Sequence, residues 1–141
     1  MMTLAVMWLL ALRVSAAGEE VARPVVRKPR LRAVRVSGRA EEVRVAAGTA
    51  TRLRFDAVLD VERTRLEEGR ERFEPLLVSH GFLLVTPREE LGEGERVALT
   101  VVLADGRELS FELEASPTEV DVQVSVITRA PSRDGLARRE L

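Results

Sequence analysis

The sequence predicts an all-β domain, an immunoglobulin-like two-sheet antiparallel β-sandwich with at most one short helical turn. Apolar residues occupy every second position in several short runs, which is the pattern of strands with one buried face. Residues typical of tight turns, such as Asp105-Gly106, separate these runs. The strand-bearing segment, 31–128, has the length of an immunoglobulin-like sandwich, about 100 residues.

The first strands are expected before residue 60. Thr49–Leu59 shows the clearest alternation, with Leu53 and Phe55 on one face and Arg52, Arg54 and Asp56 on the other. Shorter alternating runs precede it at 34–36 and 43–45. We therefore expect three strands in this part of the chain.

A strand pair and a helical turn are expected next. Leu76–Ser79 and Phe82–Thr86 are apolar and flank His80-Gly81, where glycine permits a tight turn. Thr86-Pro87-Arg88-Glu89 then has the pattern of a capping box, with proline at the first helical position. This pattern predicts one short helical turn and nothing longer.

The last strands form the strongest local pattern in the chain. Val97–Leu103 and Leu109–Ala115 flank the Asp105-Gly106 turn, which predicts a β-hairpin. In the segment 120–126, valines alternate with polar residues and are expected to share one face.

The segment Asp60–Glu74 permits two interpretations. A helix would place Glu67 and Glu71 one turn apart, but Gly69 in its middle would cost about 1 kcal/mol. The alternative is a strand, a turn at Glu68-Gly69 and a second strand. We favour the second interpretation because every neighbouring segment is a predicted strand.

The ends of the chain have a different composition from the middle. Thr3–Leu12 is an apolar run too short to span a membrane, and small residues follow it, so residues 1–17 are predicted to be a signal peptide. The alternative is a first helix or strand of a cytosolic domain. Residues 18–30 predict a basic extended linker, 31–128 the β-sandwich, and 129–141 a polar flexible tail. The expected location is therefore the periplasm or the extracellular space.

Charge is unevenly distributed along the chain. Gly18–Arg54 holds ten basic and four acidic residues, whereas Phe55–Thr128 holds seven basic and seventeen acidic ones. A basic segment of this kind can contact an anionic membrane or cell wall, or its charge can be neutralised within the fold. Nucleic-acid binding is not expected, because aromatic residues make up only 4% of the chain and few are available to stack on bases. The candidate interaction residues are Arg27, Lys28, Arg30, Arg52 and Arg54.

Residues for catalysis or metal binding are scarce in this sequence. There is no cysteine and only one histidine, His80, which we interpret as a surface turn residue. Carboxylates cluster at 67–71 and at 89–95, which could serve glycoside hydrolysis or calcium binding, but they lack calcium-loop spacing. Solvated surface charge is the favoured interpretation. No catalytic, cofactor-binding or metal-binding residue is therefore predicted.

Several segments together resemble a known family. They are Thr51–Asp56, Leu84–Pro87 with Leu91 and Gly94–Arg96, Leu99–Val101, Ala104–Gly106, Phe111–Leu113 and Asp121–Val126. In these segments the chain resembles a myxobacterial (Myxococcus) paralogous family of exported proteins of unknown function, domain of unknown function 2381. The resemblance covers about 31–128 and implies no catalytic residues. It also implies export and, in many members, a charged helix-prone segment after the β-region. A looser likeness to β-sandwich envelope subunits of type IV secretion systems rests on architecture alone.

These observations predict a noncatalytic exported domain that binds another envelope protein through a sheet edge or its loops. One alternative is a structural subunit of an envelope or secretion assembly that docks through its basic N-terminal arm. A carboxylate-based hydrolase is the third possibility. The sequence leaves the oligomeric state open.

Overall fold

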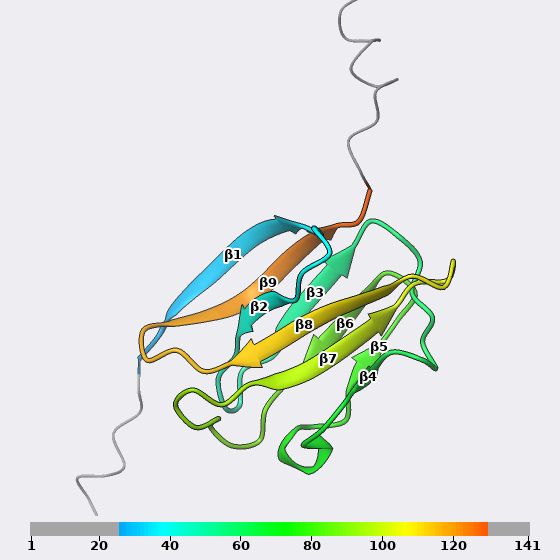
Figure 1. Cartoon of the computed structure of the whole chain (residues 1–141). Coiled ribbons are helices and arrows are strands. Elements are labelled where there is room, and N and C mark those ends of the chain that lie inside the picture. The colour runs from blue at the N-terminus through cyan, green and yellow to red at the C-terminus, as the bar shows by residue number, and fades with distance from the viewer. Residues whose placement is uncertain (1–25, 130–141) are drawn as a thin grey trace, which may run out of the picture.

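The computed structural model describes residues 26–129, which form a sandwich of two β-sheets. Figure 1 looks onto the four-stranded sheet, with the five-stranded sheet behind it. The predicted signal peptide and all but the first residue of the predicted tail lie outside the described residues. Within residues 26–129, no helix has the length and apolar character needed to cross a membrane.

The five-stranded sheet, here called sheet A, contains both the first and the last strand. Its order is β1-β9-β3-β6-β5. Its strands are β1 (Lys28–Arg35), β9 (Glu119–Ile127), β3 (Thr51–Phe55), β6 (Phe82–Val85) and β5 (Leu77–Val78).

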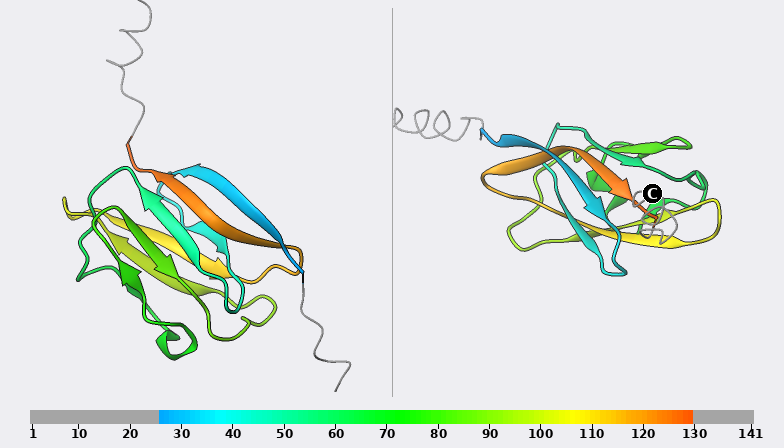
Figure 2. Two further views of the ribbon diagram at one scale, coloured as in Figure 1. Left: turned by 180° about the vertical axis from the view of Figure 1, so that it is seen from behind. Right: turned by 90° about the horizontal axis from the view of Figure 1, so that it is seen from above.

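The four-stranded sheet, sheet B, packs against it in the order β2-β8-β7-β4. Its strands are β2 (Glu41–Arg44), β8 (Glu108–Glu114), β7 (Val97–Val102) and β4 (Arg65–Leu66). The two layers are also visible from above in Figure 2.

Alternating apolar residues from both sheets form the core between them. Leu53 of β3, Leu83 of β6 and Leu99 of β7 belong to one cluster, and all three are fully buried. Phe55 and Phe111 meet edge to face across the sheets, with ring centroids 6.1 Å apart. The predicted two-layer all-β architecture is therefore confirmed.

Strand direction differs from the prediction, because the sheets are mixed rather than antiparallel. β9 runs parallel to both of its neighbours, β1 and β3, and β2 runs parallel to β8. The last strand is inserted between strands from the first half of the chain, which run in the same direction. Short turns cannot make such pairings, and local sequence does not reveal them. Immunoglobulin-like connectivity is accordingly not confirmed.

Both predicted antiparallel pairs are present. β7 and β8 pair around Asp105-Gly106, and Gly106 has a φ of 94°, a conformation that glycine adopts without a steric penalty. β5 and β6 pair around His80-Gly81, where the Ser79 N–H donates to the Phe82 carbonyl at 2.8 Å. Local turn chemistry was sufficient to predict these two pairs.

The helical turn predicted at Thr86–Glu89 is absent. Pro87 instead forms a β-bridge with Phe73, and the Arg88 N–H donates to the Arg72 carbonyl at 2.7 Å. Glu89 pairs with the side chain of Arg72 at 2.8 Å rather than capping its own turn. The backbone groups of this segment are therefore hydrogen-bonded to a distant segment, and no helix forms.

The segment 60–74 follows the favoured interpretation only in its first half. β4 is a strand of two residues, and Gly69 turns the chain with a φ of 71°. A 3-10 helix, Arg70–Arg72, stands where the second strand was expected. This turn directs Phe73 into the core, where it is 2% exposed.

β1 begins at Lys28 rather than at Leu31, so the last residues of the predicted linker belong to the sandwich. Pro29 does not interrupt β1, because its nitrogen faces the free side of this edge strand, where no ladder bond is lost. Arg27, the residue before β1, also packs onto the domain.

A β-bulge breaks the predicted alternation of valines in β9. Arg30 is opposite Asp121, but Leu31 is opposite Gln123, so β9 holds one extra residue at this point. As a result Asp121, predicted to face away from the valines, is fully buried.

Candidate interaction surface

The outer side of sheet A combines arginines with exposed apolar residues. The strand registers place on it the side chains of Leu31, Ala33, Arg35, Arg52, Arg54, Leu77, Phe82, Leu84, Gln123, Ser125 and Ile127. We call this set the arginine face. The outer side of sheet A faces the viewer in the left panel of Figure 2. None of these residues is acidic, but the carboxylate of Asp56 borders the face beside Arg54, just after β3.

The apolar part of the arginine face is well exposed at two opposite edges. Leu31 on β1 is 72% exposed and Leu77 on β5 is 61% exposed. Phe82, Leu84 and Ile127 are half-buried between these edges. Exposed apolar groups around charged ones are typical of protein-binding surfaces.

Arg52 lies near the centre of the face. Its guanidinium stacks over the Phe82 ring, 4.6 Å from the ring centroid. Its Nε atom is buried and has no hydrogen-bond partner within residues 26–129. Buried donors of this kind normally have a hydrogen-bond partner. Arg52 therefore keeps a donor that the fold does not use.

Arg54 lies two residues along the same strand and is exposed. It lines a shallow groove of about 270 Å³ together with Ser125, Ile127 and Asp56. Asp56 is already engaged, since its Oδ1 accepts hydrogen bonds from the Thr128 N–H at 2.9 Å and from the Thr128 hydroxyl at 2.5 Å. Arg54 therefore borders a groove without being neutralised by the nearest carboxylate in it.

The outer side of sheet B differs from the arginine face. The Arg96 guanidinium approaches Glu112 at 2.7 Å, Glu42 at 3.6 Å and Glu114 at 3.7 Å. Thr100 donates to Glu67 at 2.6 Å, and Arg65 pairs with the same carboxylate at 3.2 Å. Both of these arginines on the outer side of sheet B are therefore engaged by carboxylates. Glu67, one of the clustered carboxylates considered for catalysis, is held in these pairs.

The predicted basic arm is largely occupied by intramolecular contacts. Arg27 donates to Glu90 at 2.5 Å and to the Ser116 carbonyl at 2.6 Å. Arg30 forms a two-point contact with Asp121, at 2.6 and 3.1 Å. Lys28 is exposed at the start of β1. Of the five candidate interaction residues, only Arg52 and Arg54 are brought together on one open surface.

Asp121 organises the buried side of β1. Its carboxylate accepts from Arg30, from the Arg32 Nε at 3.2 Å and from the Arg44 N–H at 2.9 Å. Burial by itself raises the pKa of Asp121, but these hydrogen bonds and charges outweigh burial and lower the pKa below its ordinary value. Sequence inspection missed this residue, because an aspartate between two valines has the pattern of a solvated strand position.

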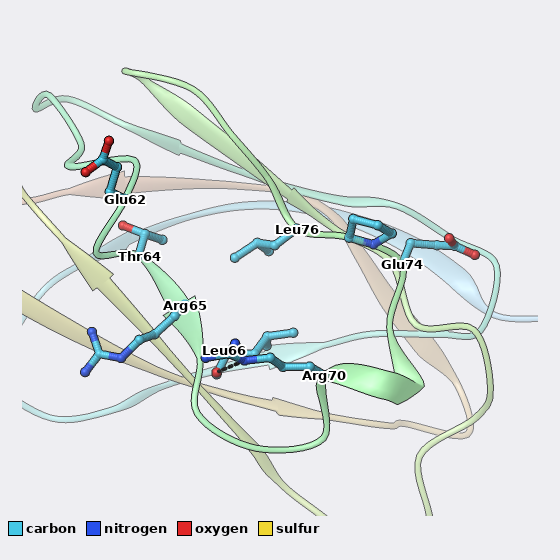
Figure 3. Close-up of a pocket in the computed structure, with 8 residues that line it drawn as sticks. Glu62, Thr64, Arg65, Leu66, Arg70, Glu74 and Leu76 are labelled. Carbon is cyan, nitrogen blue, oxygen red and sulfur yellow. Dashed lines mark hydrogen bonds between the residues drawn. The ribbon is translucent and has the colours of Figure 1, made fainter.

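A second candidate site is a cavity of about 330 Å³ between the free edges of β4 and β5. Figure 3 shows Arg65, Leu66 and Arg70 on one side of it and Leu76 on the other. The Arg70 Nε donates to the Leu66 carbonyl at 3.2 Å. No group of three or more histidine and carboxylate side chains within residues 26–129 is arranged to hold a metal ion.

His80 is exposed in the β5–β6 turn, as the sequence predicts. Its carbonyl accepts from the Leu59 N–H at 2.8 Å, which ties the turn to the segment that follows β3.

Comparison with known proteins identifies the family. No curated protein matches the chain. A family model described as "Protein of unknown function (DUF2381)" matches residues 10–141, which covers the whole of the sandwich described above. The expected resemblance is thereby confirmed, and the chain belongs to the DUF2381 family of proteins of unknown function.

Proposed function

We propose that this chain is a noncatalytic domain that binds another protein through the arginine face. The partner is one that presents carboxylates among apolar side chains. In the exported setting that the N-terminal sequence predicts, this partner is a protein of the cell envelope.

The observation that carries the proposal is that the arginines of this face have no carboxylate partner within residues 26–129, because Asp56, the carboxylate at the border of the face, is bonded to Thr128 instead. Arg35, Arg52 and Arg54 lie on the arginine face, and none of them forms an ion pair with a carboxylate within residues 26–129. Arginine binds carboxylates through two parallel hydrogen bonds, and it is enriched in protein interfaces together with aromatic residues. Arg52 stacked on Phe82 presents both kinds of group in one place.

The apolar residues favour a protein over a small anion. Leu77, Leu84 and Phe82 lie beside the arginines, and a small anion would leave them exposed to water. A protein surface can cover these residues and provide the carboxylates at the same time. The charge pairing should affect the association rate and its dependence on salt more than the final affinity.

The experiment uses the full chain as bait in envelope extracts, followed by binding measurements with each purified candidate. Charge reversal at Arg52→Glu together with Arg54→Glu should weaken binding of a true partner at least tenfold. Binding to the wild-type chain should also weaken as salt concentration rises, because the charges are exposed and screened.

The matched control is Arg63→Glu together with Arg65→Glu, which makes the same change of charge on the sheet B side. This control should keep wild-type affinity. Equal binding by both double variants would show that the arginine face is not the docking surface. Turnover of glycans or peptides by the purified chain that Glu67→Gln abolishes would overturn the noncatalytic proposal.

A further inference from the structure

β1 is an edge strand whose free side offers unpaired backbone groups. The Lys28 N–H donates to the Thr118 carbonyl at 2.8 Å, and the Val36 N–H donates to the Ile127 carbonyl at 3.0 Å. Alternate residues of a parallel strand bond to the same neighbour, so the even-numbered residues of β1 face β9. Leu31, Ala33 and Arg35 therefore turn their N–H and carbonyl groups away from the sheet. In the part of the chain that the structure describes, no strand lies beside them.

The free edge of β2 is covered by side chains. The Arg32 guanidinium donates to the Glu42 carbonyl, and the Asp121 carboxylate accepts from the Arg44 N–H at 2.9 Å. These two side chains occupy the backbone positions that an added strand would use.

The remaining edges are short. β4 has two residues, and the Arg70 side chain donates to its Leu66 carbonyl at 3.2 Å. β5 also has two residues. β1 has eight residues, so it is the longest edge in the described sandwich and the one best suited to pair with another strand.

The charge of β1 indicates which kind of strand would pair with it. Its sequence contains Lys28, Arg30, Arg32 and Arg35 and no acidic residue. Arg30 and Arg32 point inward and are paired with Asp121, so the charge of the edge that is left without an ion pair within residues 26–129 comes from Lys28 and Arg35. A second copy of this chain would bring these like charges to the same edge, and positive charges on an edge strand oppose such self-pairing. A strand that carries carboxylates has the complementary charge.

We propose that β1 accepts an extended acidic segment of a partner protein as an additional strand of sheet A. The backbone of that segment would bond to Leu31, Ala33 and Arg35, and its outward carboxylates would lie beside Arg35 on the arginine face. This inference rests on the proposed function in taking the partner to be a protein. It adds how the partner binds and which chemistry it presents.

The test uses a synthetic ten-residue peptide of alternating glutamate and valine with blocked ends, added to the isotope-labelled full chain. Amide hydrogen exchange followed by NMR should slow at least tenfold at Leu31, Ala33 and Arg35. A peptide with lysine in place of glutamate should give no such protection.

The variant Ala33→Pro removes one free N–H without removing a bond within the sheet, so the domain should remain folded. It should weaken peptide binding at least tenfold, whereas Ala33→Ser, which keeps the N–H, should bind as the wild type does. If the unfolding midpoint shows that Ala33→Pro is not folded, a peptide N-methylated at alternate residues replaces it. One of the two methylation registers should abolish binding.

Binding of the peptide without protection of the three amides would overturn strand addition, as would equal binding by folded Ala33→Pro. Equal binding of the lysine peptide would overturn the acidic specificity. The arginine face is tested separately by Arg52→Gln together with Arg54→Gln. Loss of binding in Ala33→Pro with no effect of the arginine pair would support strand addition and reject docking on the face.

Discussion

The two outer faces of this sandwich carry arginines in different situations. On sheet B, Arg96 lies among three carboxylates, and Arg65 shares one with Thr100. On sheet A, Arg52 and Arg54 form no ion pair within residues 26–129, and Arg52 stacks on an aromatic ring instead. Arginines that are neutralised by neighbours stabilise a surface, whereas arginines left open can bind another molecule. This difference is why the arginine face, and not sheet B, is proposed as the binding surface.

A third group of arginines lies between the sheets and makes the contrast clearer. Arg30 and Arg32 point inward from β1 and share the buried Asp121. Through Arg44 and Glu42 the same cluster reaches β2 of the other sheet. These arginines hold the two sheets together along one side, so they are structural although sequence position suggested an interaction role for Arg30.

The largest expected effect is on this buried cluster. Asp121→Asn would leave Arg30 and Arg32 without their common carboxylate and should lower the free energy of unfolding by about 3 kcal/mol. Urea denaturation measures this change. Asp105→Asn, at an exposed turn, is the matched control and should leave the midpoint nearly unchanged. Equal effects of the two substitutions would mean that the buried cluster does not hold the sheets together.

Acid should weaken the same cluster in wild-type protein. The folded-state pKa of Asp121 is lower than its unfolded value, so its contribution to stability is present above the unfolded pKa, about 4, and is lost as pH falls through the folded pKa. The free-energy difference between the wild-type chain and Asp121→Asn should therefore shrink below about pH 4. Denaturation series at several pH values test this. A difference that stays constant across the acid range would show that folding does not lower the pKa of Asp121.

The smallest changes in stability are expected for arginines on the two outer faces. The order of these changes tests whether the arginines of sheet A and sheet B differ as described. Arg52→Met and Arg54→Met should each stay within about 0.5 kcal/mol of the wild type, because neither arginine gives up a carboxylate partner. Arg96→Met should lower the unfolding midpoint, because Glu42, Glu112 and Glu114 would then repel one another. Thermal denaturation resolves this order. A larger drop in the unfolding midpoint for Arg52→Met than for Arg96→Met would contradict our view that sheet B holds the stabilising arginines and sheet A the binding ones.

The strands themselves could largely be predicted from local patterns. The hairpin of β7 and β8 has uninterrupted alternation and a turn that its own residues specify. The alternation in β3 also predicted which of its side chains share a face. For this reason Arg52 and Arg54 could be predicted to lie together. Such features depend on residues only one or two positions apart, so periodicity is enough to reveal them.

Failed predictions arose where a distant segment supplied the bonds. Thr86–Glu89 has a sound helix-start pattern, but its backbone pairs with the segment 72–74 instead. The bulge in β9 that buries Asp121 has no counterpart in the alternation of the valines around it. In both places a contact across the fold outweighs a weak local preference.

Composition and alternation alone were therefore enough to establish an all-β chain, most of its strands, its two hairpin turns and the buried and exposed faces of β3, β7 and β8. Packing decided which arginines pair with a carboxylate and which lie on the surface without such a partner. Arg30 and Arg52 were both candidate interaction residues on sequence grounds, and each is followed by a leucine. Only the parallel insertion of β9 brings Asp121 to the first of them and leaves the second without a carboxylate. Long-range pairing sets that difference, because charge neutralisation depends on distances of a few ångströms that no local pattern encodes.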